Sequence, residues 1–300
     1  MASTETAPKR RLIDPRNAYP RPPFPKQAQS LPGTVAEMQP RPDHGEKSYR
    51  GSGRLTGLAT LITGGDSGIG KAAAIAFARE GADVVISYLS ENEDAQDTVR
   101  LIEAEGRRAI AVPGDLSDEA QAKQLAQRAK DELGRVDVLV NNAAFQQRFE
   151  SIGEIPTEIW DRTMRTNLSA MFWLCREIVP GMEPGASVIN TASIQARDPS
   201  SSLLAYATTK GGIVAFSQAL ASEVAQKGIR VNVVAPGPVW TPLIPASTDP
   251  EGTSKFGAQS PLGRPAQPAE LAPAFVFLAS TDASYITGEV LAVTGGEFFS

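Results

Sequence analysis

The sequence predicts an α/β fold: one doubly wound parallel sheet of about seven strands with helices on both faces, preceded by an extended N-terminal arm. From about residue 55, apolar runs of four to six residues alternate with stretches of helical periodicity, which is the pattern of a parallel sheet covered by helices. Nine of the 23 prolines fall within the first 50 residues, where neither period occurs. We therefore expect an arm over residues 1–54 and one domain over residues 55–300.

Seven apolar runs are the expected strands of the sheet. They cover residues 59–63, 83–88, 108–112, 136–141, 186–190, 230–234 and 290–293. Helical periodicity fills the stretches between them, near residues 69–80, 92–105, 118–133, 157–180, 202–227 and 268–280. Because strand and helix alternate almost strictly and no internal repeat is visible, a single domain accounts for all these elements.

The arm differs from the rest of the chain in charge as well as in proline content. Its first 50 residues hold nine Lys or Arg against five Asp or Glu, a net charge of +4, which leaves −9 for the remainder. One interpretation is a flexible solubilising tail. The other is an extended segment that lies on the main domain or on a neighbouring subunit, anchored by Phe24, Leu31, Met38 and Tyr49. The opposite charges of arm and body favour this second interpretation.

Composition excludes several classes of protein. Cys175 is the only cysteine and stands in an apolar run, so no disulfide forms within the chain and we expect a buried thiol in a reducing compartment. The first 11 residues lack the apolar stretch of a signal peptide, and no run of 18 apolar residues occurs, which predicts a cytoplasmic protein without membrane spans. The formal net charge of −5 argues against broad nucleic-acid binding.

His44 is the only histidine, and it lies in the arm. A Ser-His-Asp hydrolase or a histidine-based dehydrogenase mechanism is excluded unless this residue reaches a pocket. We expect it in a solvated turn, Asp43-His44-Gly45. No Cys/His cluster with the spacing of metal ligands occurs, so no metal site is expected.

A glycine-rich turn follows the first expected strand and precedes a helix. It reads Thr63-Gly64-Gly65-Asp66-Ser67-Gly68-Ile69-Gly70. Glycines in such a turn let the chain leave the strand, let backbone N–H groups approach a pyrophosphate and let the helix pack closely on the sheet. The partial positive charge of the helix N-terminus then faces the phosphates. A purely structural turn is the alternative, as for Gly51-Ser52-Gly53, which follows no strand.

The end of the second expected strand bears on the choice between NADP and NAD. An acidic residue there would bind the adenosine ribose hydroxyls and repel a 2′-phosphate, but Tyr88 is neutral and is followed by Leu89 and Ser90. No Lys or Arg stands in the glycine turn or just after the second strand to attract the phosphate, and Asp66 in the turn is acidic. We expect NADP rather than NAD, with NAD as the alternative.

Tyr206 and Lys210 are the candidate proton-transfer pair. Their i,i+4 spacing near the start of an expected helix places both side chains on one face. An ammonium beside a phenol favours the phenolate and lowers the tyrosine pKa from about 10 toward the working pH.

With these features, residues 55–300 resemble the classical short-chain dehydrogenase/reductase family, whose members have a Rossmann fold. The matching elements occur in the family's order. They are Thr63-Gly64 to Gly68-Ile69-Gly70, Asn141-Asn142-Ala143-Ala144, Thr166-Asn167-Leu168, Ser193, Tyr206 with Lys210, and Pro236-Gly237. Ala144 replaces the family's glycine. The element Pro42-Asp43-His44-Gly45-Glu46 resembles an N-terminally extended, NADP-dependent group of aldehyde reductases and glucose dehydrogenase-like enzymes that are often tetrameric.

The resemblance implies roles for four residues. Tyr206 exchanges a proton with the substrate oxygen while hydride moves to or from the nicotinamide, and Ser193 holds the same oxygen. Lys210 binds the nicotinamide ribose, and Asn167 holds a water that links Lys210 to solvent. It also implies a set of cofactor-binding residues: Gly64, Asp66, Ser67, Gly68, Ile69, Gly70, Tyr88, Asp115, Leu116, Asn142, Ala143, Tyr206, Lys210, Pro236, Gly237, Val239 and Thr241.

Substrate choice is expected to lie with residues 240–262, which are rich in Pro, Ser, Thr and Gly and are typical of a mobile lid or a surface loop. Leu243, Ile244 and Phe256 offer apolar lining. The side chains expected near the mouth are Gln146, Gln147, Gln195 and Arg197.

These features predict an enzyme that transfers a hydride between NADP(H) and a small aldehyde or ketone, or the corresponding alcohol. The alternatives are a sugar dehydrogenase of the glucose type, a 3-oxoacyl-carrier-protein reductase, and a cofactor-binding regulator without catalysis. We also expect a homotetramer, because the helices over residues 157–180 and 202–227 offer more apolar surface than one sheet face needs.

Overall fold

The computed structural model describes residues 12–297. Its centre is a sheet of seven parallel strands in the order β3-β2-β1-β4-β5-β6-β7, which confirms the predicted fold class. The strands are β1 (Ala59–Thr63), β2 (Asp83–Tyr88), β3 (Ala109–Pro113), β4 (Val138–Asn141), β5 (Ser187–Thr191), β6 (Arg230–Pro236) and β7 (Val290–Val293).

The direction of the strand order reverses between β1 and β4. Thr60 of β1 faces Val84 of β2 on one side and Val138 of β4 on the other. The loops that leave β1 and β4 therefore run to opposite faces of the sheet, which opens a crevice at the carboxyl ends of these strands.

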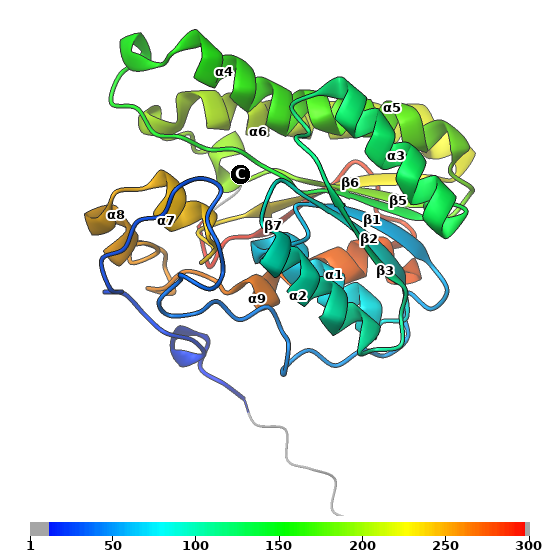
Figure 1. Ribbon diagram of the computed structural model, residues 1–300, viewed down its shortest axis with the longest axis horizontal. Coiled ribbons are helices and arrows are strands. Elements are labelled where there is room, and N and C mark those ends of the chain that lie inside the picture. The colour runs from blue at the N-terminus through cyan, green and yellow to red at the C-terminus, as the bar shows by residue number, and fades with distance from the viewer. Residues whose placement is uncertain (1–11, 298–300) are drawn as a thin grey trace, which may run out of the picture.

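Helices cover both faces of the sheet (Figure 1). α1 (Gly68–Arg79), α2 (Asn92–Glu103) and α9 (Pro268–Ala279) lie on one face. The other face carries α3 (Glu119–Leu133), α4 (Thr157–Met164), α5 (Ala170–Ile178) and α6 (Leu204–Val224). Two short helices, α7 (Leu243–Ser247) and α8 (Pro250–Ser254), lie beyond the end of the sheet.

Two apolar cores hold these layers together. Small residues let α1 approach the sheet closely, because Ala72, Ala73, Ala74 and Ala76 are all fully buried beneath it. On the opposite face the core includes Cys175, whose thiol is buried as predicted. The central strands β1, β4 and β5 are buried along their whole length because both of their faces are covered, whereas the edge strands β3 and β7 are only partly buried.

The helix predicted over residues 157–180 is divided. α4 passes into a π-helical turn, Arg165–Ser169, before α5 begins. Such a turn inserts one extra residue into the helix and often occurs at functional sites. Apolar periodicity does not reveal it, because the apolar face continues on both sides of the insertion.

The described part of the arm, residues 12–54, lies against the domain of its own chain, without a strand and with a single 3-10 turn, Pro15–Asn17. Phe24 and Met38 are buried and form a third apolar cluster with Trp240 and Ile244. The ring centres of Phe24 and Trp240 are 4.3 Å apart. Figure 1 shows the arm crossing from α7 and α8 toward α1.

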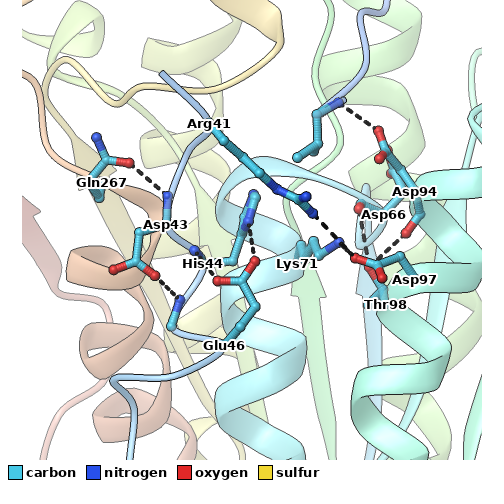
Figure 2. Close-up of polar contacts among 12 residues, drawn as sticks. Arg41, Asp43, His44, Glu46, Asp66, Lys71, Asp94, Asp97, Thr98 and Gln267 are labelled. Atoms are coloured by element: carbon cyan, nitrogen blue, oxygen red, sulfur yellow. Dashed lines mark hydrogen bonds and ion pairs between the residues drawn. The ribbon is translucent and has the colours of Figure 1, made fainter. Parts of the chain in front are cut away.

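The expectation that His44 occupies a solvated turn is wrong, because the residue is only 1% exposed. Its Nδ1 lies 3.1 Å from Oε1 of Glu46, as Figure 2 shows. Arg79 at the end of α1 donates to the backbone oxygens of Gly45, Glu46 and Tyr49, at 2.7–2.8 Å. These contacts fix the turn on the domain. Burial is the largest influence on the imidazole and lowers the pKa of His44.

Within residues 12–297, no helix is both long enough and apolar enough to cross a membrane.

Candidate active site

A cleft of about 430 Å³ opens at the carboxyl ends of the central strands, a size typical of small-molecule sites. It lies where the strand order reverses. Its walls come from the loops that follow the first six strands, β1 to β6, and from the segment that contains α7 and α8.

The glycine turn after β1 forms one wall of the cleft. Gly64 and Gly68 have φ angles of +62° and +51°, in the left-handed region that favours glycine. A Cβ atom on Gly70 would lie 1.9 Å from the backbone oxygen of Gly64. The chain therefore folds back on itself here, and the first turn of α1, which has no side-chain cap, directs its N–H groups toward the cleft.

The cleft also contains polar atoms that lack a protein partner. Among the described residues, the buried hydroxyls of Ser87 and Thr191 have no hydrogen-bond partner, and both residues line the cleft. Buried hydroxyls are normally paired. Together with the uncapped helix end, they fit a polar, phosphate-bearing ligand such as a dinucleotide.

Two carboxylates stand near the end of β2. Asp66 in the glycine turn is buried, and both Asp66 and Glu91 line the cleft. Burial is the largest cause that raises the pKa of Asp66 to about 7, and the charges of Glu91 and Asp94 act in the same direction. Below that pH the carboxyl group is neutral and does not repel a phosphate.

Tyr206 and Lys210 lie together in the cleft, as the spacing predicts. The Nζ atom of Lys210 is 5.1 Å from the centre of the Tyr206 ring and donates to the backbone oxygen of Thr191 at 2.8 Å. Ser193 follows β5, is buried and lines the same cleft. All three groups therefore face one space.

The predicted direction of the Tyr206 pKa is wrong. Burial raises the pKa of Tyr206 to about 12, although a hydrogen bond with Ser193 opposes this change. Burial also lowers the pKa of Lys210 to about 7. Desolvation disfavours both charged forms, and it outweighs the attraction between ammonium and phenolate from which the lower tyrosine pKa was expected.

Asn167 does not line the main cleft. It stands in the π-helical turn beside a small cavity of about 10 Å³ that it shares with Asn141 and Thr191, roughly the space of one water molecule. Among the described residues, Oδ1 of Asn141 and Oγ1 of Thr191 are buried acceptors without a donor.

The structure gathers nearly all the residues predicted for the site. Of the predicted catalytic and cofactor-binding residues, only Asn167 and Gly70 do not line the cleft; Gly70 lies behind the turn. The predicted lid contributes Leu243, Ile244 and Phe256, and the mouth includes Gln146 and Gln195 but not Gln147 or Arg197.

Sequence reasoning missed several residues of the cleft. Arg148 and Arg162 line its outer part, and Leu31 and Pro32 reach it from the arm. An arginine in a loop carries no local signal of its position. Leu31 was expected as an anchor of the arm, but a proline-rich segment has no periodicity that could place it at the cleft.

Comparisons with known proteins identify the family of the chain. The profile of a family described as Enoyl-(Acyl carrier protein) reductase matches residues 64–297. The chain is 51% identical over 288 residues to "Uncharacterized oxidoreductase YghA" of Escherichia coli, covering 95% of this chain and 98% of that protein. It is 44% identical over 272 residues to "NADPH-dependent aldehyde reductase 1, chloroplastic" of Arabidopsis thaliana, covering 88% and 94%. A "Glucose and ribitol dehydrogenase" of Daucus carota is 43% identical over 280 residues, covering 91% and 96%.

Solved structures show the same architecture. A short-chain dehydrogenase of Burkholderia cenocepacia in complex with NADP superposes with a TM-score of 0.76 at 31% identity, covering 81% of this chain and 98% of that one. A blue fluorescent protein from a metagenomic library, in complex with NADPH, gives a TM-score of 0.74 at 35% identity, with the same coverage of both chains. The chain therefore belongs to the short-chain dehydrogenase/reductase family of oxidoreductases.

Proposed function

We propose that this protein transfers a hydride between NADP(H) and a small aldehyde or ketone, or the corresponding alcohol. The observation that carries the proposal is the convergence of Tyr206, Lys210 and Ser193 on a cleft that begins at the glycine turn. The proposal divides the chain into an arm, residues 1–54, and a dinucleotide-binding catalytic domain, residues 55–300.

The cleft offers a binding region for each part of a dinucleotide. The turn with Gly64, Ser67, Gly68 and Ile69 would hold the pyrophosphate. Tyr88, Asp66, Asp115 and Leu116 would surround the adenosine. The nicotinamide end would contact Asn142, Ala143, Pro236, Gly237, Val239 and Thr241.

The chemistry divides between cofactor and protein. NADPH, when bound, supplies the hydride. During reduction the Tyr206 hydroxyl donates its proton to the carbonyl oxygen, and the Ser193 hydroxyl holds that oxygen by a hydrogen bond. A high tyrosine pKa keeps the proton on Tyr206 until the substrate oxygen becomes basic.

Lys210 and Asn167 would return the proton to Tyr206. With a pKa near 7, the Lys210 amine gains and loses a proton at physiological pH. The small cavity beside Asn167 adjoins Thr191, whose backbone oxygen binds Lys210. This arrangement supports a water in the cavity beside Asn167, near the unpaired Oδ1 of Asn141 and Oγ1 of Thr191, as the link between Lys210 and solvent.

Four observations support NADP over NAD. β2 ends in the neutral Tyr88, and burial raises the pKa of Asp66 to about 7, which weakens its repulsion of a phosphate near neutral pH. The Arabidopsis relative is named as NADPH-dependent, and the two structures above contain NADP or NADPH. NAD stays the second choice, because the described residues that line the cleft after β2 and β3 include no Lys or Arg.

A sugar dehydrogenase is the second candidate function, favoured by the name of the carrot relative. The remaining candidates are a 3-oxoacyl-carrier-protein reductase and a cofactor-binding regulator without catalysis. The complete set of Ser193, Tyr206 and Lys210 in one cleft argues against a regulator.

The test is NADPH consumption across a panel of aldehydes, ketones, oxidised sugars and an acyl-carrier substrate. Tyr206→Phe is expected to lower turnover at least ~100-fold while keeping its affinity for NADPH. Tyr285→Phe, at a fully exposed position, is the matched control. Equal turnover in wild type and Tyr206→Phe would contradict the mechanism, and the preferred substrate separates the candidate functions.

We also propose a cytoplasmic homotetramer. Phe172 of α5 is an exposed large apolar side chain that packs edge-on against Phe216 of α6, with ring centres 6.5 Å apart. This apolar patch favours burial against another copy of the chain. Sedimentation should detect an assembly of four chains; a single species of 31.8 kDa would contradict the proposal.

A further inference from the structure

The arm reaches into the cleft that the cofactor is proposed to occupy. Leu31 and Pro32 are half-buried and line it, beside Pro242 of the opposite wall. At Gly33, where φ is +84°, a Cβ atom would lie 2.8 Å from the backbone oxygen of Pro242. The arm therefore passes directly over the start of the segment that carries α7 and α8, and no larger residue fits at that crossing.

On one side of the cleft, hydrogen bonds join the arm to the segment with α7 and α8. The backbone N–H of Gln29 donates to the oxygen of Pro245 at 2.9 Å. Phe24 and Ser254 are joined twice: the Phe24 N–H donates to the Ser254 oxygen at 2.8 Å, and the Ser254 hydroxyl donates to the Phe24 oxygen at 2.6 Å. The indole N–H of Trp240 donates to the oxygen of Pro40 at 2.8 Å.

On the other side, the arm is joined to α2. The backbone N–H of Val35, a buried residue, donates to Oδ2 of Asp94 at 2.8 Å. Arg41 lies 3.9 Å from the carboxylate of Asp97, which also binds Lys71 of α1 at 2.6 Å (Figure 2). Lys71 belongs to the first turn of α1, directly after the glycine turn.

These contacts lead to an inference that rests on the proposed function. We infer that residues 29–35 form a strap across the cofactor cleft, with Leu31 and Pro32 as part of the dinucleotide site, and that the strap slows cofactor release. It connects the two sides of the cleft: α2, which begins directly after the cleft-lining Glu91 on the adenosine side, and the segment with α7 and α8 on the nicotinamide side. Cofactor exchange then requires the walls to separate against the bonds of the strap.

Most of the arm has a counterpart in the Escherichia coli relative. The match to the Escherichia coli relative covers 95% of this chain. Even if all the unmatched residues fell within residues 1–54, most of the arm would still lie inside the match.

The inference is tested by the rate of NADPH dissociation, followed by stopped-flow fluorescence after mixing the loaded enzyme with excess NADP⁺. Asp94→Ala removes the acceptor of the Val35 N–H, and Leu31→Ala removes apolar contact from the cleft. Each is expected to raise the dissociation rate roughly tenfold. Asp94→Asn removes the same charge, with the same effect on Asp66, but keeps an acceptor oxygen for the Val35 N–H, so it should release NADPH more slowly than Asp94→Ala.

Lys26→Ala is the matched control within the arm, because it removes only an exposed ion pair with Glu251, a type that contributes little. Wild-type dissociation rates in both Asp94→Ala and Leu31→Ala would overturn the inference and leave the proposed function standing if NADPH is still consumed. If the wild type binds no NADPH, the proposed function itself fails. Should Asp94→Ala not fold, Leu31→Ala still decides the question.

Discussion

The side chain of Asn167 and the backbone of Phe145 exchange two hydrogen bonds. The Phe145 N–H donates to Oδ1 at 2.7 Å, and Nδ2 donates to the Phe145 oxygen at 2.9 Å. Nδ2 also donates to Oγ1 of Thr209 at 3.1 Å, one residue before Lys210. The π-helical turn thus places one amide where it joins the loop after β4 to the catalytic segment of α6.

Asn167→Ala is expected to lower both stability and turnover. It leaves the buried N–H and oxygen of Phe145 without partners, which costs about 1–3 kcal/mol of unfolding free energy, and it frees α6 to shift beside Lys210. Asn167→Asp should be no better, because it presents a carboxylate to the Phe145 oxygen. Urea unfolding and turnover measure the two effects, with the exposed Asn17→Ala as control. Wild-type stability of Asn167→Ala would contradict the assigned role.

Lys210→Met is expected to remove part of the pH dependence of stability. Burial lowers the pKa of Lys210 from 10.5 to about 7, so between these values the unfolded chain binds a proton that the folded chain does not. The free energy of unfolding therefore rises with pH across this window, by at most ~5 kcal/mol from this group. Denaturation at pH 7, 8 and 9 should show a smaller rise in Lys210→Met. The exposed Lys227→Met is the control, and equal slopes in all three proteins would count against a buried, neutral amine.

The affinity for NADPH is expected to fall as the pH rises through about 7. Asp66 lines the cleft, and burial, followed by the charges of Glu91 and Asp94, raises its pKa to about 7. Above that value its carboxylate repels the phosphates, which we expect to weaken binding roughly tenfold. Fluorescence titration at pH 6, 7 and 8 should show a weaker trend in Asp66→Asn and a lower midpoint in Glu91→Gln. If the pH dependence of NADPH affinity were unchanged in Asp66→Asn, another ionisable group would be its cause.

The sequence predicts the sheet well because each buried parallel strand is a short apolar run that can be recognised from neighbouring residues alone. β1, β2 and β7 begin and end at the predicted residues, and β4 starts two residues later than expected. The same holds for the site: the glycine turn, Ser193 and Tyr206 stand at strand ends or near the start of a helix, and the sheet brings such positions to one edge.

What the sequence does not reveal depends on contacts between distant segments. His44 is buried because Arg79 and Gln267 hold its turn against the domain, and neither residue is near it in the sequence. The five-residue helices α7 and α8 are too short for periodicity to indicate. The pKa of Tyr206 depends mainly on its burial, which the i,i+4 spacing of Tyr206 and Lys210 in the sequence does not reveal.

The junction between arm and domain depends on Glu80, whose side chain is fully buried at the end of α1. Its carboxylate accepts from the Tyr49 hydroxyl at 2.6 Å, from the N–H groups of Ser52 and Arg54 at 2.8 and 3.0 Å, and from the Arg54 guanidinium at 2.7 Å. Burial alone would raise the pKa of Glu80, but these hydrogen bonds outweigh it and lower the pKa to about 2.

Glu80→Gln is therefore expected to destabilise the protein by roughly 3 kcal/mol. The NH2 group of the glutamine side chain cannot accept the hydrogen bonds that a carboxylate oxygen accepts, and the Arg54 guanidinium loses its charged partner. The lowered pKa also sets the pH dependence of this effect. The contribution of Glu80 to the free energy of unfolding is complete above about pH 4.5 and is lost as the pH falls toward 2. Wild type and variant should thus converge in stability on acidification. Glu105→Gln, which breaks a partly exposed pair with Arg79, is the matched control and should cost at most about 1 kcal/mol. If Glu80→Gln and Glu105→Gln lost equal free energy of unfolding at neutral pH, the buried Glu80 network would stabilise the protein no more than a partly exposed ion pair does.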